Sequence, residues 1–214
     1  EGVKEQVREH FPKAEIHRRN TGYAIDVLIN DLEDARDTQH CNVAKLLCGS
    51  EGTLAFTSEI ELRLDEIPPA YGAMVVTHYD SLEGCLSDVE TVMKHTLYTC
   101  EMMDKVILDC TKGNKLYSSA RDFVVGDPEA LLMLEVRAHT AEELTRQVSE
   151  LIDFLKQQSS SYASPVLEGD SIQKAHELRK AGLGLLGNMI GDEKAVACIE
   201  DTAVALSDLK PFIM

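Results

Sequence analysis

The order of strand-forming and helix-forming segments after Pro68-Pro69 constrains the fold of this chain more than any other feature. Beyond this proline pair, runs rich in strand-forming residues alternate with segments of helical periodicity. The order is strand, helix, strand, short helix, strand, helix, strand, which is typical of the ferredoxin-like arrangement with split βαβ units. We therefore predict an α+β domain whose strands are residues 73–78, 97–103, 130–138 and 162–167.

Capping residues support the helices of this domain. Asp80 or Ser81 precedes the first amphipathic segment, and Thr140 begins a capping box before the longest one. A third helix is expected to begin near Asp170 and to end in a glycine-rich stretch. Residues 195–206, which read AVACIEDTAVAL, are then predicted to form a last strand.

The segment before Pro68-Pro69 has a different pattern, and this proline pair is the predicted domain boundary. Apolar residues four positions apart predict a helix over residues 2–11. Residues 30–42 are dense in polar side chains and are expected to form a loop. Residues 53–64 alternate between apolar and polar positions, which predicts a strand.

A tight turn is predicted at Gly49-Ser50-Glu51-Gly52, directly before this expected strand. Two glycines three residues apart let the backbone approach a neighbouring group that a Cβ atom would block. Such a turn suits close contact with a flat or phosphorylated ligand, although many ordinary hairpin turns have the same spacing. The turn lacks the lysine of a P-loop, which disfavours a nucleoside triphosphate as the ligand.

Composition excludes several classes of function. The formal net charge is −16, from 37 acidic and 21 basic residues, which disfavours nucleic acid as a partner. The densest basic cluster is only Arg18-Arg19. No apolar run is long enough to suggest a membrane span.

Cysteines and histidines give no metal framework. The six cysteines include no CxxC pair, and the seven histidines are dispersed along the chain. Scattered cysteines in apolar runs indicate reduced core residues, so we expect a cytoplasmic protein without a metal site in this chain.

Five segments together resemble one family, the FAD-linked 2-hydroxyacid dehydrogenases, which are flavoproteins of the vanillyl-alcohol oxidase type. They are NTGY at 20–23, GSEGTLA at 49–55, EMMD at 101–104, RKAGLGLL at 179–186 and IEDTAV at 199–204. They occur in the order in which the family has them. The last two look closest to the large D-lactate or D-2-hydroxyglutarate dehydrogenases, in which the flavin module is fused to an iron–sulfur region.

The resemblance implies that the chain is an internal piece of a longer FAD-dependent enzyme. Residues 1–68 would be the C-terminal part of an FAD-binding domain of the PCMH type, and residues 69–214 an incomplete cap domain that recognises substrate. The parent would oxidise a D-2-hydroxyacid (lactate, glycolate or 2-hydroxyglutarate) to the 2-oxoacid and pass electrons to downstream iron–sulfur centres. It would be cytoplasmic, or held at a membrane surface by electron-transfer partners. The isolated chain is expected to be inactive and to bind FAD weakly, with the general base beyond residue 214.

The resemblance also implies roles for particular residues. Substrate contacts are expected at Tyr23 and at Arg179, whose planar guanidinium fits a carboxylate. His176, three residues before Arg179, is expected at the surface. Backbone contacts with FAD are expected at Asn20, Thr21, Gly22, Gly49, Ser50, Glu51, Gly52 and Thr53.

Each of these roles has a plainer alternative. The two glycine segments can be ordinary turns, and Arg179 can be a solvated helix residue. The chain also departs from the family pattern, with Ala205 where a proline is often found and Ile199 where hydroxyglutarate-specific relatives place a lysine. The particular hydroxyacid therefore stays open.

A second interpretation is a non-catalytic module. Ferredoxin-like sheets also serve as ligand-binding or dimerisation modules, and a fold alone does not decide function. Strand edges exposed within residues 1–66 would favour a homodimer.

Overall fold

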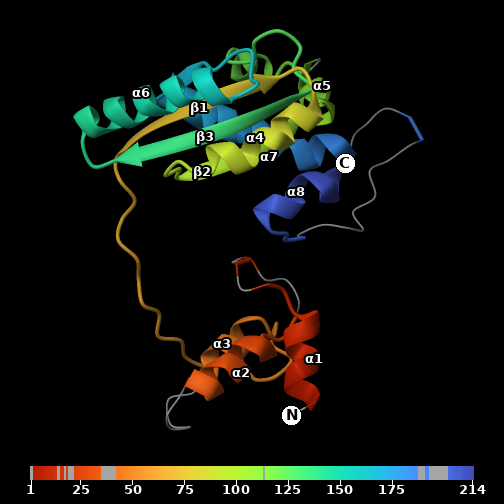
Figure 1. Cartoon of the computed structure of the whole chain (residues 1–214). Helices are drawn as coiled ribbons and strands as arrows, with labels where there is room; N and C mark the ends of the chain where they lie inside the picture. The colour runs from red at the N-terminus through yellow and green to blue at the C-terminus, as the bar shows by residue number, and fades with distance from the viewer. Residues whose placement is uncertain are drawn as a thin grey trace. The chain divides into compact units, whose positions relative to one another are not determined.

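The computed structural model describes residues 2–13, 15, 16, 18, 22–34, 42–112, 114–187, 191, 192 and 202–214. The chain divides into two compact units. The first contains Glu1–Asp65 with Cys198–Ala205, and the second contains Glu66–Ala197 with Leu206–Met214. The sheet belongs to the second unit (Figure 1).

The second unit is built on a 4-stranded antiparallel sheet with the order β2-β3-β1-β4. Because β3 lies between β1 and β2, these two strands are parallel to each other and are joined by a helix, which is a split βαβ unit. The predicted α+β, ferredoxin-like fold is therefore confirmed. The strands are β1 (Tyr71–Tyr79), β2 (Thr99–Asp104), β3 (Ala130–Ala138) and β4 (Val166–Glu168).

Helices cover both faces of this sheet (Figure 1). On one face, α4 (Leu82–Val92) and α6 (Ala141–Gln158) pack against one set of core residues. On the other face, α5 (Lys105–Lys112) and α7 (Asp170–Gly187) pack with the short helix η2 (Ser118–Arg121) against a second set. Burial of both faces explains why β3 is an almost continuous apolar run.

The capping residues act as the sequence indicates. The Ser81 side chain accepts a hydrogen bond from the backbone N–H of Gly84 at the start of α4. The Thr140 side chain does the same for Glu143 at the start of α6. Each cap satisfies a backbone donor that has no partner within its helix.

The predicted last strand, residues 195–206, is not confirmed in its described part. Residues 202–205 have no regular structure, and Leu206 begins α8 (Leu206–Ile213), while residues 195–201 lie outside the described residues. Leu209 of α8 packs against the core on the α4 side, and Lys210 Nζ lies 2.8 Å from Glu83 Oε1. The end of the predicted strand is therefore followed directly by a helix, α8, whose apolar side packs next to α4.

The first unit contains three helices among its described residues: α1 (Gly2–His10), α2 (Ile25–Asp34) and α3 (Ala44–Cys48). The helix expected over residues 2–11 is confirmed. The loop expected over residues 30–42 is wrong at its start, because α2 continues to Asp34, and residues 35–41 lie outside the described part. The apolar residues of α2 recur at helical spacing, so its polar end belongs to an amphipathic helix.

The strand predicted over residues 53–64 is wrong. This segment is extended, but no described residue pairs with it, and its apolar side chains are exposed, with Phe56 94% accessible. Alternating side chains indicate which face would be buried, whereas a strand also needs a hydrogen-bonded neighbour.

His78, on β1, is a fully buried histidine whose two ring nitrogens are both occupied. Nδ1 donates to the Val76 carbonyl at 2.9 Å, and Nε2 accepts from the Val125 backbone N–H at 3.1 Å. These partners fix one neutral tautomer. Burial lowers the pKa of His78, and hydrogen bonds to backbone carbonyls offset only part of that effect.

We predict that His78 makes the second unit less stable in mild acid. The unfolded chain takes up a proton near pH ~6.5, whereas the folded chain does so at lower pH, so the free energy of unfolding falls as pH falls from about 6.5. Each unit of pKa depression contributes about 1.4 kcal/mol. Urea unfolding at several pH values between about 7.5 and 5 measures this effect. The same pH dependence in His78→Gln as in the original chain would contradict it.

Candidate functional site

The glycine turn of the first unit adopts the tight conformation predicted for it. Glu51 and Gly52 have positive φ angles of 49° and 76°. Ser50 is buried and its hydroxyl donates to the Leu47 carbonyl at 2.9 Å, while the backbone N–H of Thr53 donates to the Ser50 carbonyl at 2.9 Å. The turn is therefore held by its own hydrogen bonds.

The second glycine segment contacts this turn. The Tyr23 hydroxyl lies 2.7 Å from Thr53 Oγ1. A Cβ atom on Gly49 would lie 3.0 Å from the Gly22 carbonyl oxygen, so this close approach favours glycine at position 49. Gly22, with φ of 80°, and Tyr23 thus lie against Gly49 and Thr53, although 26 or more residues separate them along the chain. Asn20 and Thr21, also predicted to contact FAD, lie outside the described residues.

The turn has donors available for a ligand. In the part of the chain that the structure describes, no acceptor is found for the backbone N–H groups of Glu51 and Gly52. Successive N–H groups in left-handed backbone form a concave site that suits an anion or a carbonyl oxygen. The arrangement fits a contact with the pyrophosphate or the ring carbonyls of a flavin nucleotide.

In the second unit, Arg179 on α7 forms an ion pair with Glu101 on β2. Arg179 Nε lies 3.2 Å from Glu101 Oε2, and the two side chains are 47% and 30% exposed. The guanidinium therefore uses its Nε edge for protein, and its two terminal NH₂ groups have no partner among the described residues. A half-exposed guanidinium with both terminal nitrogens available can take a carboxylate with two hydrogen bonds.

Sequence reasoning missed Glu135, a buried carboxylate on β3 close to this ion pair. Its side chain is 2% exposed. Oε1 accepts from Arg137 Nε at 2.6 Å, and Oε2 lies 3.1 Å from His176 Nε2 and 3.4 Å from Thr99 Oγ1. The signal in the sequence is a Glu-x-Arg pair inside an otherwise apolar strand, since a buried charge needs a partner.

His176 corrects one expectation. It was expected at the surface, but its side chain is only 24% exposed and pairs with Glu135. Because His176 and Arg179 are three residues apart, they lie on one side of α7. Two polar contacts, His176 with Glu135 and Arg179 with Glu101, therefore connect this side of the helix to neighbouring strands.

Close packing against α5 also fixes the position of α7. A Cβ atom on Gly182 would lie 3.0 Å from Ile107 Cδ1. Ala175 and Leu178, on the side of α7 that faces the core, are fully buried. Arg179 thus belongs to a helix that is closely packed both before this residue, at Ala175 and Leu178, and after it, at Gly182. This rigidity favours a binding role over that of a freely moving surface arginine.

The described residues hold neither a cluster of metal-binding side chains nor a membrane-spanning helix. Within those ranges, no group of three or more His, Cys, Asp or Glu side chains is arranged to hold a metal ion. Among the helices that the structure describes, none is long and apolar enough to cross a membrane.

Comparison with known proteins identifies relatives over nearly the whole chain. A D-2-hydroxyglutarate dehydrogenase of Pantoea ananatis is 29% identical over 99% of this chain and 21% of its own length. Enzymes of the same name from Pseudomonas putida and Haemophilus influenzae are 28% and 27% identical, over 98% and 93% of the chain. The chain spans about a fifth of the length of these curated relatives. Residues 68–214 match the model of the C-terminal domain of FAD linked oxidases, and the chain therefore belongs to this family.

Proposed function

We propose that this chain is part of an FAD-dependent dehydrogenase that oxidises a D-2-hydroxyacid to the 2-oxoacid. Residues 1–68 contribute to its FAD-binding domain, and residues 69–214 to the domain that recognises substrate. Family membership and the names of the relatives support the reaction class. The substrate class covers hydroxyacids of the lactate, glycolate and 2-hydroxyglutarate type.

The observation that carries this proposal is the geometry of Arg179. Its terminal nitrogens are available, while Glu101 occupies its Nε edge and so limits rotation of the guanidinium. In our proposal, Arg179 binds the substrate carboxylate and Glu101 is a positioning residue. Two hydrogen bonds to the carboxylate would fix the orientation of the substrate, including its α-carbon. Hydride transfer requires such a fixed orientation.

The glycine turn supplies the proposed contact with the cofactor. FAD, when bound, supplies the acceptor for the hydride of the substrate α-carbon. The N–H groups of Glu51 and Gly52 would donate to it, and the Tyr23–Thr53 contact would hold the two glycine segments together. We further expect electrons to leave through an iron–sulfur region of the same protein, which works in the cytoplasm or at a membrane surface.

The test uses the full-length protein that carries this chain. We expect it to purify with bound flavin, seen as an absorbance band near about 450 nm. Anaerobic addition of D-lactate, glycolate or D-2-hydroxyglutarate should bleach this band, whereas L-lactate should not. A colourless protein that releases no flavin on denaturation would overturn the proposal. So would bleaching that fails with every D-2-hydroxyacid while a reductant such as dithionite still bleaches the flavin.

Exposed apolar residues favour a second, structural role for residues 53–67. Apolar and polar side chains alternate over residues 53–64. The apolar residues of this segment and Ile67 after it are exposed to solvent: Leu54, Phe56, Ile60, Leu62, Leu64 and Ile67. An unpaired segment of this kind can add to a strand of a second copy. We therefore propose that the isolated chain forms a homodimer through it.

Light scattering coupled to gel filtration measures the predicted dimer. The chain should elute at twice its monomer mass of 23.7 kDa at high concentration. Phe56→Ser with Leu62→Ser should give the monomer, because these changes remove apolar surface from one face of the segment. Glu59→Ser, on the alternate face, is the control. A dimer unaffected by the double change would exclude this interface.

A further inference from the structure

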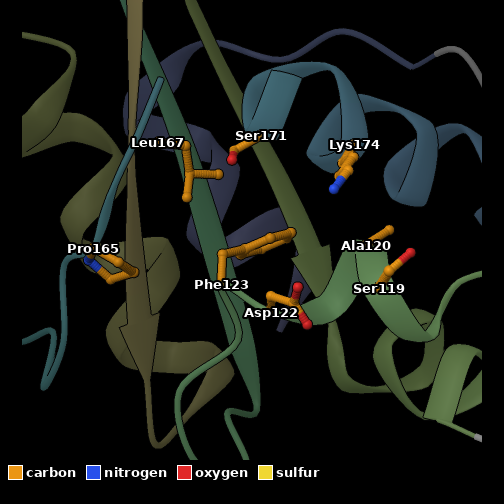
Figure 2. A pocket seen from close by; sticks show the side chains of 8 residues that line it. All are labelled: Ser119, Ala120, Asp122, Phe123, Pro165, Leu167, Ser171 and Lys174. Carbon is orange, nitrogen blue, oxygen red and sulfur yellow. The ribbon is translucent and has the colours of Figure 1, made fainter. Parts of the chain in front are cut away.

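A surface cavity of about 260 Å³ lies in the second unit, where η2 and the residues after it face the beginning of α7 (Figure 2). Its floor is apolar and includes Phe123, Leu167 and Pro165. Phe123 and Leu167 are buried members of the core on this face of the sheet. The cavity therefore rests on packed core residues that give it a fixed shape.

Oppositely charged side chains reach into this space from two sides. Figure 2 shows Lys174 coming from α7 and Asp122 coming from the end of η2, with the ring of Phe123 between them. Among the described residues, neither Lys174 nor Asp122 forms an ion pair. The side-chain hydroxyls of Ser119 and Ser171, which also line the cavity, likewise have no hydrogen-bond partner in the described part of the chain.

The cavity is separate from the proposed carboxylate site. Lys174 precedes Arg179 by five residues, which corresponds to about 140° around an α-helix. The two cations therefore lie on different sides of α7, and a ligand in the cavity would not contact Arg179.

We propose that this cavity binds a small zwitterion, namely an α-amino acid with a short apolar side chain. The carboxylate is held by Lys174 and by Ser171, which is in the first turn of α7, where the helix dipole also favours negative charge. The ammonium group is held by Asp122 on the opposite wall. The apolar side chain covers Phe123 and Leu167.

Charge and size select this class over others. A ligand with only a negative charge would pair with Lys174 but would be repelled by Asp122. A ligand with only a positive charge would pair with Asp122 but would be repelled by Lys174. A volume of about 260 Å³ is below the ~300–1,000 Å³ of sites for larger ligands, which limits the occupant to a small molecule. Two charge-assisted contacts at a site open to water predict a dissociation constant of about 1 mM. This binding is independent of the proposed dehydrogenase reaction.

The test is a titration of the 214-residue chain with L-valine, followed by proton–nitrogen correlation NMR. We expect saturable shifts at the amides of Ser119, Phe123, Ser171 and Lys174. Isovalerate and isobutylamine, which each carry one of the two charges, should bind about tenfold more weakly. Lys174→Gln and Asp122→Asn should each weaken valine binding by a similar factor, whereas Lys156→Gln on α6 should not.

Three results would overturn the proposal. One is the absence of saturable shifts up to about 20 mM valine in a chain whose spectrum shows that it is folded. Another is equal affinity for valine and either single-charge analogue, or for valine and its hydroxy acid analogue. The third is unchanged binding in both Lys174→Gln and Asp122→Asn. None of these results depends on flavin, so they can be distinguished from failure of the dehydrogenase proposal.

Discussion

Replacing Arg179 with alanine is expected to lower kcat/KM for the D-2-hydroxyacid by about 10²–10³-fold in the full-length protein. The change removes both terminal NH₂ groups and leaves Glu101 without its cation. The substrate carboxylate would then meet an uncompensated negative charge. Arg179→Lys keeps the charge but loses the planar fork, so it should recover only part of the activity. Steady-state kinetics with each variant measures the effect.

A double substitution separates binding from repulsion. If Glu101 repels the substrate once Arg179 is gone, Arg179→Ala with Glu101→Gln should be about tenfold more active than Arg179→Ala alone. Glu101→Gln by itself should raise KM, because Arg179 then loses the partner that orients it. Arg146→Ala on α6, an exposed arginine paired with Glu150, is the matched control. Unchanged KM and kcat in Arg179→Ala would contradict the assigned role.

The order of elements in the second unit could be predicted from the sequence because its signals are local. Strand-forming runs, helical periodicity and caps such as Ser81 and Thr140 depend on residues close together in the chain. β3 begins and ends at the predicted residues, since both of its faces are buried and nearly all of its side chains are apolar. The split βαβ order then allows few sheet topologies.

The failures concern contacts between distant residues. Residues 53–64 have the alternation of a strand, but the alternation does not tell whether a partner strand exists. Glu135 and His176 are 41 residues apart, and nothing near either one in the sequence indicates their contact. The resemblance pointed to both glycine segments, yet the contact between Tyr23 and Thr53 that joins them needed the structure.

Removal of the Glu135 carboxylate should destabilise the second unit by about 2–4 kcal/mol. In Glu135→Ala, Arg137 and His176 lose their shared acceptor, and a cavity opens under α7. Glu135→Gln should cost less, because its amide oxygen still accepts one hydrogen bond while its NH₂ group faces another donor. The chain has no tryptophan, so urea unfolding is best followed by far-ultraviolet circular dichroism.

The same substitution links stability to function. Glu135 holds the side of α7 that carries Arg179, so Glu135→Ala should also raise KM at temperatures where the protein remains folded. Glu168→Gln is the matched control, since Glu168 is an exposed glutamate on β4 and should change stability by less than about 0.5 kcal/mol. If Glu135→Ala unfolds at a lower urea concentration but keeps its KM, Glu135 supports the fold alone. If both parameters change and Glu135→Gln restores part of each, the buried carboxylate positions the helix that binds substrate.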